Sequence, residues 1–131
     1  MEGPEGIRPI FWLGNSRKNV RRFPDEVRDV MGYGLFLAQK GGKHPDAKPL
    51  RGFRGAGVLE IIEAYDGNAY RGIYTVKLAG VVYVLHAFQK KSKKGIATPR
   101  HDLDLVKDRL KVAREHHAQW SKQQERKGRM P

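Results

Sequence analysis

Residues 58–88 read VLEIIEAYDGNAYRGIYTVKLAGVVYVLHAF, and this stretch decides the fold. It contains three segments rich in apolar, β-branched and aromatic residues, at 58–64, 69–78 and 81–88. Two turn sequences, Asp66-Gly67-Asn68 and Ala79-Gly80, separate these segments. Strand-forming segments that are joined by short glycine-containing turns pair with their neighbours in antiparallel fashion. The stretch therefore predicts a three-stranded antiparallel meander.

The sequence on the amino-terminal side predicts one more strand and two helices. Residues 7–13 are apolar and include Pro9, which favours a strand at the edge of a sheet. Asn15-Ser16 is a typical helix cap, so a short basic helix is expected over residues 17–22. A longer amphipathic helix is expected from Pro24, because apolar and small residues then recur at helical spacing up to Gly41-Gly42.

The sequence after the meander predicts a final helix. Thr98 is a suitable cap, Pro99 suits the first helical position, and an apolar stripe runs from Leu103 to His117. The expected order is β-α-α-β-β-β-α, which indicates an α+β domain with a sheet of about four strands. We assign residues 1–118 to this single domain and expect residues 119–131, which are polar and basic, to form a flexible tail.

The composition favours a polyanionic partner. The 131 residues carry a formal net charge of +12, and residues 86–131 hold 13 of the 26 basic side chains but only 5 of the 14 acidic ones. A field of this sign attracts nucleic acid, anionic lipid or an acidic protein. No apolar stretch is long enough to span a bilayer, and the first residues lack the basic and apolar regions of a secretory signal. We therefore expect a cytoplasmic protein without a membrane partner.

Several common chemistries lack their motifs. The chain has no cysteine, so disulfides, thiolate zinc sites and a cysteine nucleophile are excluded. The five histidines show no metal-ligand spacing, and no phosphate-binding glycine motif precedes a helix. We expect neither a metal nor a cofactor.

Basic and aromatic residues should gather at one end of the meander. His86 and Phe88 are two residues apart on one strand and so share a face, and Lys90, Lys91, Lys93 and Lys94 follow at once. Because a tight turn joins the last two strands, Arg71 should lie beside Phe88 and the lysines. Tyr74 lies on the same strand as Arg71, and Lys48 and Arg51 lie in the basic glycine- and proline-rich segment 44–57.

Such a cluster suits RNA. Cations neutralise phosphate, an aromatic ring stacks on an unpaired base, and the 2′-hydroxyl of RNA is itself a nucleophile. The residues alone leave other interpretations open. His86 can be an ordinary half-buried histidine, Arg71 can pair with Glu60 or Glu63 at the surface, and the lysines can form a solvated loop. A non-catalytic nucleic-acid-binding module, or a scaffold that holds an acidic partner, fits the same charges.

The ordered motifs of the chain resemble those of the phage-derived, HigB-like branch of the HigB/RelE toxin superfamily. The resemblance extends over about residues 7–117 and rests on an ordered set of short sequences: KPL at 48–50, GVLE at 57–60, YRGIY at 70–74, VYVLHAF at 82–88, KKS at 90–92 and TP at 98–99. It implies a RelE-like fold and the toxin of a type II toxin–antitoxin pair. It also implies a metal-independent mRNA interferase, an endoribonuclease that acts on ribosome-bound mRNA.

The resemblance also implies partners and residue roles. Expected partners are mRNA, the ribosome and an antitoxin of the helix-turn-helix type, encoded nearby; a module that only binds nucleic acid or the antitoxin is the alternative. Arg71 corresponds to a strand arginine that stabilises the charge on the scissile phosphate, and Lys90, Lys91 and His86 are candidates for phosphate binding or acid–base catalysis. The other expected substrate contacts are Phe88, Tyr74, Lys93, Lys94, Lys48 and Arg51. Some relatives carry lysines on the strand before the arginine, whereas this chain has Glu60 and Glu63, so the general base stays open.

Overall fold

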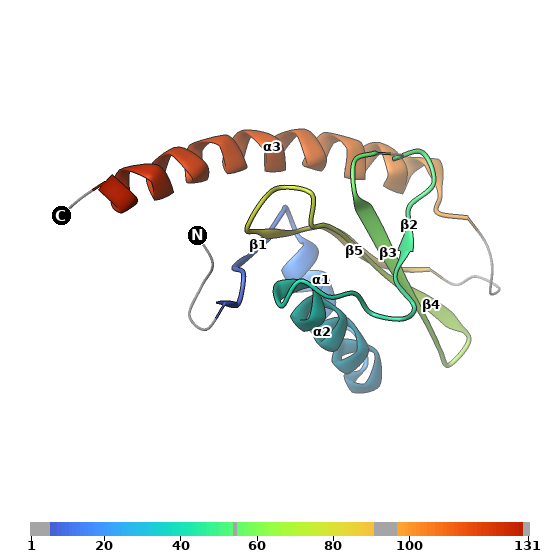
Figure 1. Cartoon of the computed structure of the whole chain (residues 1–131). Coiled ribbons are helices and arrows are strands. Elements are labelled where there is room, and N and C mark those ends of the chain that lie inside the picture. The colour runs from blue at the N-terminus through green and yellow to red at the C-terminus, as the bar shows by residue number, and fades with distance from the viewer. Residues whose placement is uncertain (1–5, 54, 91–96, 130–131) are drawn as a thin grey trace.

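The computed structural model describes residues 6–53, 55–90 and 97–129 (Figure 1). Its centre is a five-stranded sheet, with the strands in the order β1 (Ile10–Trp12), β5 (Val82–Lys90), β4 (Asn68–Thr75), β3 (Val58–Tyr65) and β2 (Lys48–Pro49). Strands β3, β4 and β5 form the predicted antiparallel meander, and β1 pairs with β5 in parallel. The helices are α1 (Ser16–Arg21), α2 (Asp25–Gln39) and α3 (Arg100–Arg129). The α+β class is confirmed, with one strand more than expected.

Two segments differ from the sequence-based expectation. The segment 44–57 contains β2, whose Lys48 and Pro49 pair with β3; two residues that include a proline carry no periodic signal. The tail expected over residues 119–131 is instead a continuation of α3 as far as Arg129. Glutamine, lysine, glutamate and arginine are good helix formers, and a helix that has already been nucleated gains one hydrogen bond per added residue without needing an apolar face.

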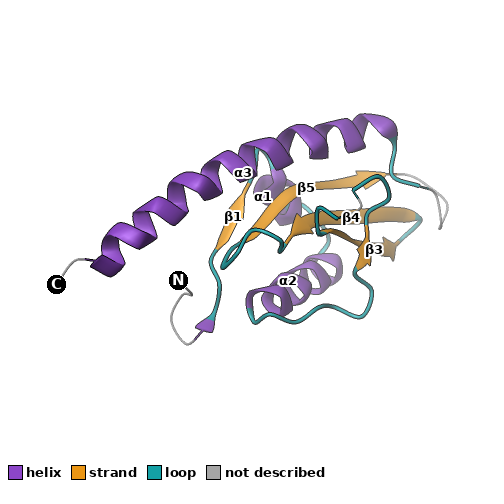
Figure 2. Cartoon of the chain, turned by 45° about the horizontal axis from the view of Figure 1, so that its top comes forward, coloured by secondary structure: helices purple, strands orange, loops and turns teal. Residues whose placement is uncertain are grey.

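Helices cover both faces of the sheet (Figure 2). On one face, Val27, Met31 and Leu35 of α2 pack against a buried core from β3, β4 and β5. Gly72 on β4 lets α2 approach closely, because a Cβ at this position would lie 2.8 Å from Met31 Sδ. On the other face, Val106 and other residues of α3 pack against a second buried cluster. None of the helices in the described ranges is long and apolar enough to cross a membrane.

Helix α1 covers the part of the β5 edge that β1 leaves open. The Ser16 hydroxyl donates to the Val84 carbonyl at 3.4 Å, and the Asn19 amide donates to the Ala87 carbonyl at 2.7 Å. Asn15 occupies the predicted capping position, but its side chain makes no capping hydrogen bond. Its carbonyl oxygen accepts instead from Arg109 of α3, at 2.9 Å.

A β-bulge changes the direction of side chains on β5. Ile73 of β4 pairs with His86, whereas the next residue, Tyr74, pairs with Val84, so Leu85 is the extra residue. After the bulge, His86 contacts α3. The bulge therefore places His86 on the α3 face of the sheet, two residues before Phe88.

We expect Val106→Ala to lower the free energy of unfolding by about 2 kcal/mol, because it removes two fully buried methyl groups and leaves a cavity. The matched variant Val112→Ala lies on the same helix, but its side chain is 50% exposed, and its effect should stay within about 0.5 kcal/mol. Urea unfolding followed by circular dichroism measures both. Equal losses would contradict the packing of α3 against the sheet.

Candidate functional site

An open groove of about 500 Å³ lies on the α3 face of the sheet. Its walls come from three places that are far apart in the sequence: β2 and the residues after it, strands β3 and β4, and the segment that leads into α3 together with the first turn of that helix. Lys48 and Arg51 contribute exposed positive charge, and Ile62 and Leu103 contribute apolar surface. The groove therefore combines cations with an apolar wall, and a positively charged groove is one of the features with which proteins hold a single strand of nucleic acid.

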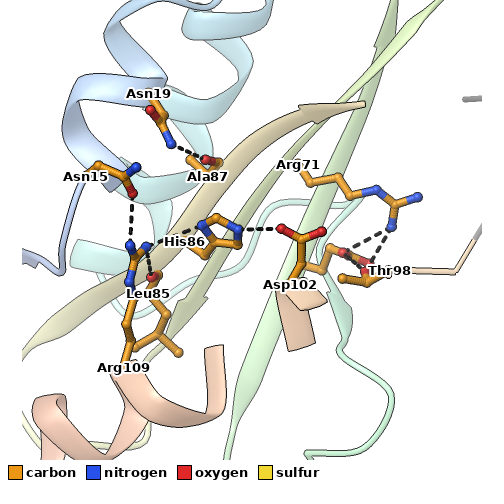
Figure 3. Close-up of polar contacts among 10 residues, drawn as sticks. Asn15, Asn19, Arg71, Leu85, His86, Ala87, Thr98, Asp102 and Arg109 are labelled. Atoms are coloured by element: carbon orange, nitrogen blue, oxygen red, sulfur yellow. Dashed lines mark hydrogen bonds and ion pairs between the residues drawn. The ribbon is translucent and has the colours of Figure 1, made fainter. Parts of the chain in front are cut away.

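A buried charged cluster forms part of the groove. Arg71 is only 1% exposed, and its Nη1 lies 3.2 Å from Glu60 Oε2 and 3.0 Å from Thr98 Oγ1. The Thr98 hydroxyl donates in turn to the same Glu60 oxygen at 2.5 Å (Figure 3). Removing two charges from water costs several kcal/mol, and such a pair is tolerated because each group finds a charged and a hydrogen-bonding partner. Of the two ion pairs considered for Arg71, with Glu60 or with Glu63, the structure contains the pair with Glu60, and this pair is largely buried.

The structure brings together some of the expected site residues. Arg71, Lys48 and Arg51 line one groove, and β2, which the sequence did not reveal, supplies Lys48. Arg71 and Phe88 occupy directly opposite positions on β4 and β5, as expected. Lys90 ends β5 and is half-buried. The remaining expected lysines, Lys91, Lys93 and Lys94, lie outside the described residues.

Tyr74 does not belong to this site. It lies in the buried cluster beneath α2, on the opposite face of the sheet from Arg71, and is 1% exposed. Burial raises the pKa of its hydroxyl to about 12. The expectation that Tyr74 contacts substrate is therefore corrected, and the reason is the alternation of side chains along a strand, which places residues an odd number apart on opposite faces.

His86 is engaged at both ring nitrogens. Its Nε2 lies 2.8 Å from Asp102 Oδ1, and its Nδ1 lies 3.3 Å from Arg109 Nη1. Because arginine can only donate, Nδ1 must accept and the proton must reside on Nε2, which donates to Asp102. Arg109 also donates to the Leu85 carbonyl at 3.0 Å. This geometry holds the neutral imidazole in place and leaves no ring nitrogen for the expected acid–base role.

Burial is the main cause that lowers the pKa of His86. The hydrogen bond and charge of Asp102 oppose this shift, whereas the positive charges of Arg109 and His101 add to it. The imidazole is therefore kept neutral over a wider pH range than an exposed histidine, in agreement with the tautomer that the hydrogen bonds require.

Asp102 and Arg109 were not among the site residues predicted from the sequence. Asp102 lies four residues before the buried Val106 and Arg109 three residues after it, so both lie on the face of α3 that meets the sheet. Polar residues at such spacing are a signal of a buried polar contact, but the sequence does not name the partner. Among the described residues, no group of three or more histidine, aspartate or glutamate side chains is placed to hold a metal ion.

Comparisons with known proteins give one family and one similar structure. A sequence model of the family described as "Phage derived protein Gp49-like (DUF891)" matches residues 18–111. A chain in the crystal structure of the toxin–antitoxin complex RelBE2 from Mycobacterium tuberculosis is similar, with 18% sequence identity and a TM-score of 0.41. That match covers 70% of this chain and 100% of the other. No curated protein sequence matches significantly.

The lowered pKa of His86 predicts a loss of stability in mild acid. The unfolded chain binds a proton near the ordinary pKa of 6.5, whereas the folded chain binds it only at lower pH. The free energy of unfolding should therefore fall as the pH drops from 6.5 to 5, by at most about 2 kcal/mol for one proton. His86→Gln should flatten this fall. His101→Gln, on the exposed side of α3, removes only the smallest of the causes that lower the pKa of His86 and should retain most of the fall. Urea titrations across this pH range test the assignment, and an unchanged pH dependence in His86→Gln would contradict it.

Proposed function

We propose that this chain, which belongs to the family of phage-derived Gp49-like proteins, is the toxin of a type II toxin–antitoxin pair and cleaves mRNA. The observation that carries this proposal is the groove in which the buried Arg71 meets the exposed cations Lys48 and Arg51. The ordered sequence motifs that resemble HigB/RelE toxins support the same function. The proposed partners are ribosome-bound mRNA and a helix-turn-helix antitoxin encoded nearby.

The proposed reaction uses the nucleophile that RNA carries. The 2′-oxygen attacks the adjacent phosphorus, the bond from phosphorus to the 5′-oxygen breaks, and the products are a 2′,3′-cyclic phosphate and a 5′-hydroxyl. The step needs in-line positioning, a base for the 2′-hydroxyl proton, positive charge at the phosphate and a proton for the leaving oxygen. Side chains can meet each of these needs without a metal ion.

Arg71 and Glu60 are the groups that we assign to the centre of this reaction. The Arg71 guanidinium would stabilise the charge that develops on the phosphate, and Glu60 would accept the 2′-hydroxyl proton. Thr98 holds the Glu60 carboxylate and Arg71 in one cluster, which fixes their geometry before substrate arrives. We assign the proton for the leaving oxygen to a lysine, with Lys90 and Lys91 as the candidates.

A second function is favoured by one specific observation. Arg71 is paired with Glu60 and almost fully buried, so the pair adds no net charge to the groove and offers little surface to a phosphate. A protein that binds RNA through Lys48 and Arg51 without cleaving it is consistent with this arrangement. Salt-dependent RNA binding with no cleaved message, in the presence of ribosomes, would identify this function.

Arg71→Gln should reduce mRNA cleavage about 10²- to 10³-fold, because it removes a charged donor from the reacting phosphate. The measurement is inducible expression with and without the neighbouring antitoxin gene, followed by mapping of message 5′ ends at matched protein levels. Arg28→Gln is the control, since Arg28 forms an exposed ion pair with Asp25 on α2. Thermal unfolding checks that the Arg71 variant is folded, and normal cleavage by that folded variant would refute the assigned site.

The double variant Lys48→Gln/Arg51→Gln tests the groove without disturbing the core, because both side chains are exposed. If each contacts one phosphate of a single strand, the slope of log K against log salt should fall in magnitude by about 1.4. Lys40→Gln/Lys43→Gln removes the same charge at the end of α2 and should change the slope less. Equal changes in the two double variants would indicate general charge attraction rather than a groove.

A further inference from the structure

A second pocket lies beside the paired residues Arg71 and Phe88, on the side away from the first groove. It measures about 210 Å³ and is lined by Asn19 of α1, by Arg22 and Phe23 just after that helix, and by Phe88 and Gln89 of β5. The first groove is bordered by β4 and β3, whereas this pocket is bordered by β5 and α1, so the two lie in opposite directions from the pair along the sheet. Arg71 and Phe88 are directly paired in the sheet, so their backbones are about 5 Å apart, which is the spacing of neighbouring strands. A strand of RNA held at Arg71 therefore has this pocket within reach of its next nucleotide.

Phe88 offers the pocket an aromatic surface whose orientation is fixed. Its ring stacks on the His86 imidazole, with ring centres 4.8 Å apart and planes inclined by 22°. His86 is held from both sides by Asp102 and Arg109, as Figure 3 shows. Arg109 is fixed in turn by Asn15, and it lies against Gly14, where a Cβ would overlap the guanidinium. The network therefore makes His86 a rigid backing for the Phe88 ring.

The charge around the pocket favours a polyanion. Arg17, Lys18, Arg21 and Arg22 are all exposed, and residues 16–22 contain no acidic residue. In the part of the chain that the structure describes, none of these four side chains takes part in an ion pair. Arg22 and the Gln89 amide can donate hydrogen bonds to the edge of a base or to phosphate. An aromatic ring beside unpaired cations is the combination that binds unpaired nucleotides.

We propose that the pocket between α1 and β5 binds an unpaired base of the RNA strand, adjacent to the linkage held at Arg71. Phe88 stacks on the base, Arg22 contacts its edge or the neighbouring phosphate, and His86 is a positioning residue for Phe88. This inference rests on the proposed function in taking RNA as the substrate. It adds a site that selects the nucleotide next to the cut.

The test uses an uncleavable probe, so that binding is measured apart from catalysis. The probe is a ten-nucleotide 2′-O-methyl RNA that carries one 2-aminopurine, moved from position to position, whose fluorescence is quenched by stacking. Wild-type protein should quench one position most strongly. Phe88→Leu, which keeps the apolar volume, should abolish that quenching and weaken binding about tenfold or more. Arg22→Gln should weaken binding and reduce the magnitude of the salt slope by about 0.7.

Two further variants separate the pocket from general effects. Lys18→Gln removes the same charge from α1 but lies outside the pocket, so quenching should persist. His86→Gln should reduce quenching in a protein that is still folded by circular dichroism, because Phe88 loses its backing. The proposal would be overturned if Phe88→Leu quenched the probe as strongly as the wild type, or if Lys18→Gln no longer quenched it.

The outcomes also separate this pocket from the proposed function. If the wild type quenches the probe but cleaves no message, the nuclease function fails and the base pocket stands. If Phe88→Leu and Arg22→Gln bind the probe normally but escape neutralisation by the antitoxin, the pocket is a protein-binding site and our proposal is wrong.

Discussion

The buried contact between Arg71 and Glu60 joins the parts of the molecule that surround the groove. Arg71 comes from β4, Glu60 from β3, and Thr98, which bonds to both, from the segment before α3. Removing one member of a buried pair typically costs about 3–5 kcal/mol, because the other charge loses its compensation. The same contact that carries the proposed chemistry therefore also fixes how α3 approaches the sheet.

A second contact fixes α3 one turn later. Asp102 lies four residues after Thr98, and its carboxylate accepts a hydrogen bond from His86 Nε2 on β5. The chain at the start of α3 is thus tied to β3 and β4 through Thr98, just before the helix, and to β5 through Asp102 in its first turn. Polar groups that are buried and mutually satisfied define one geometry more narrowly than apolar packing does. The relative positions of Arg71 and Phe88, on which the proposed base pocket depends, are set by these ties as well as by strand pairing.

Strand pairing was predictable from sequence, whereas side-chain partners were not. The three segments rich in apolar, β-branched and aromatic residues and the two short turns predicted the meander and the proximity of Arg71 to Phe88, which the register confirms. Side chains alternate between the two faces of a strand, and applying this rule to Tyr74, three residues from Arg71, would have excluded it from the site. The bulge at Leu85 has no sequence signal, because it depends on how β5 fits against β4. Helix α3 runs past Trp120 because intrinsic propensity sustains it where the apolar pattern ends.

The two margins of the sheet have a consequence for association between molecules. An open strand edge offers unpaired amide and carbonyl groups to any neighbouring chain, and this is a common route to aggregation. Here the outermost strands are only three and two residues long, Pro9 precedes one, and Pro49 lies in the other. Proline cannot donate a backbone hydrogen bond. The Asn19 side chain also occupies the Ala87 carbonyl of β5, on the edge that β1 leaves open. At high concentration, copies of this chain therefore find little backbone with which to build a continuous cross-β ribbon.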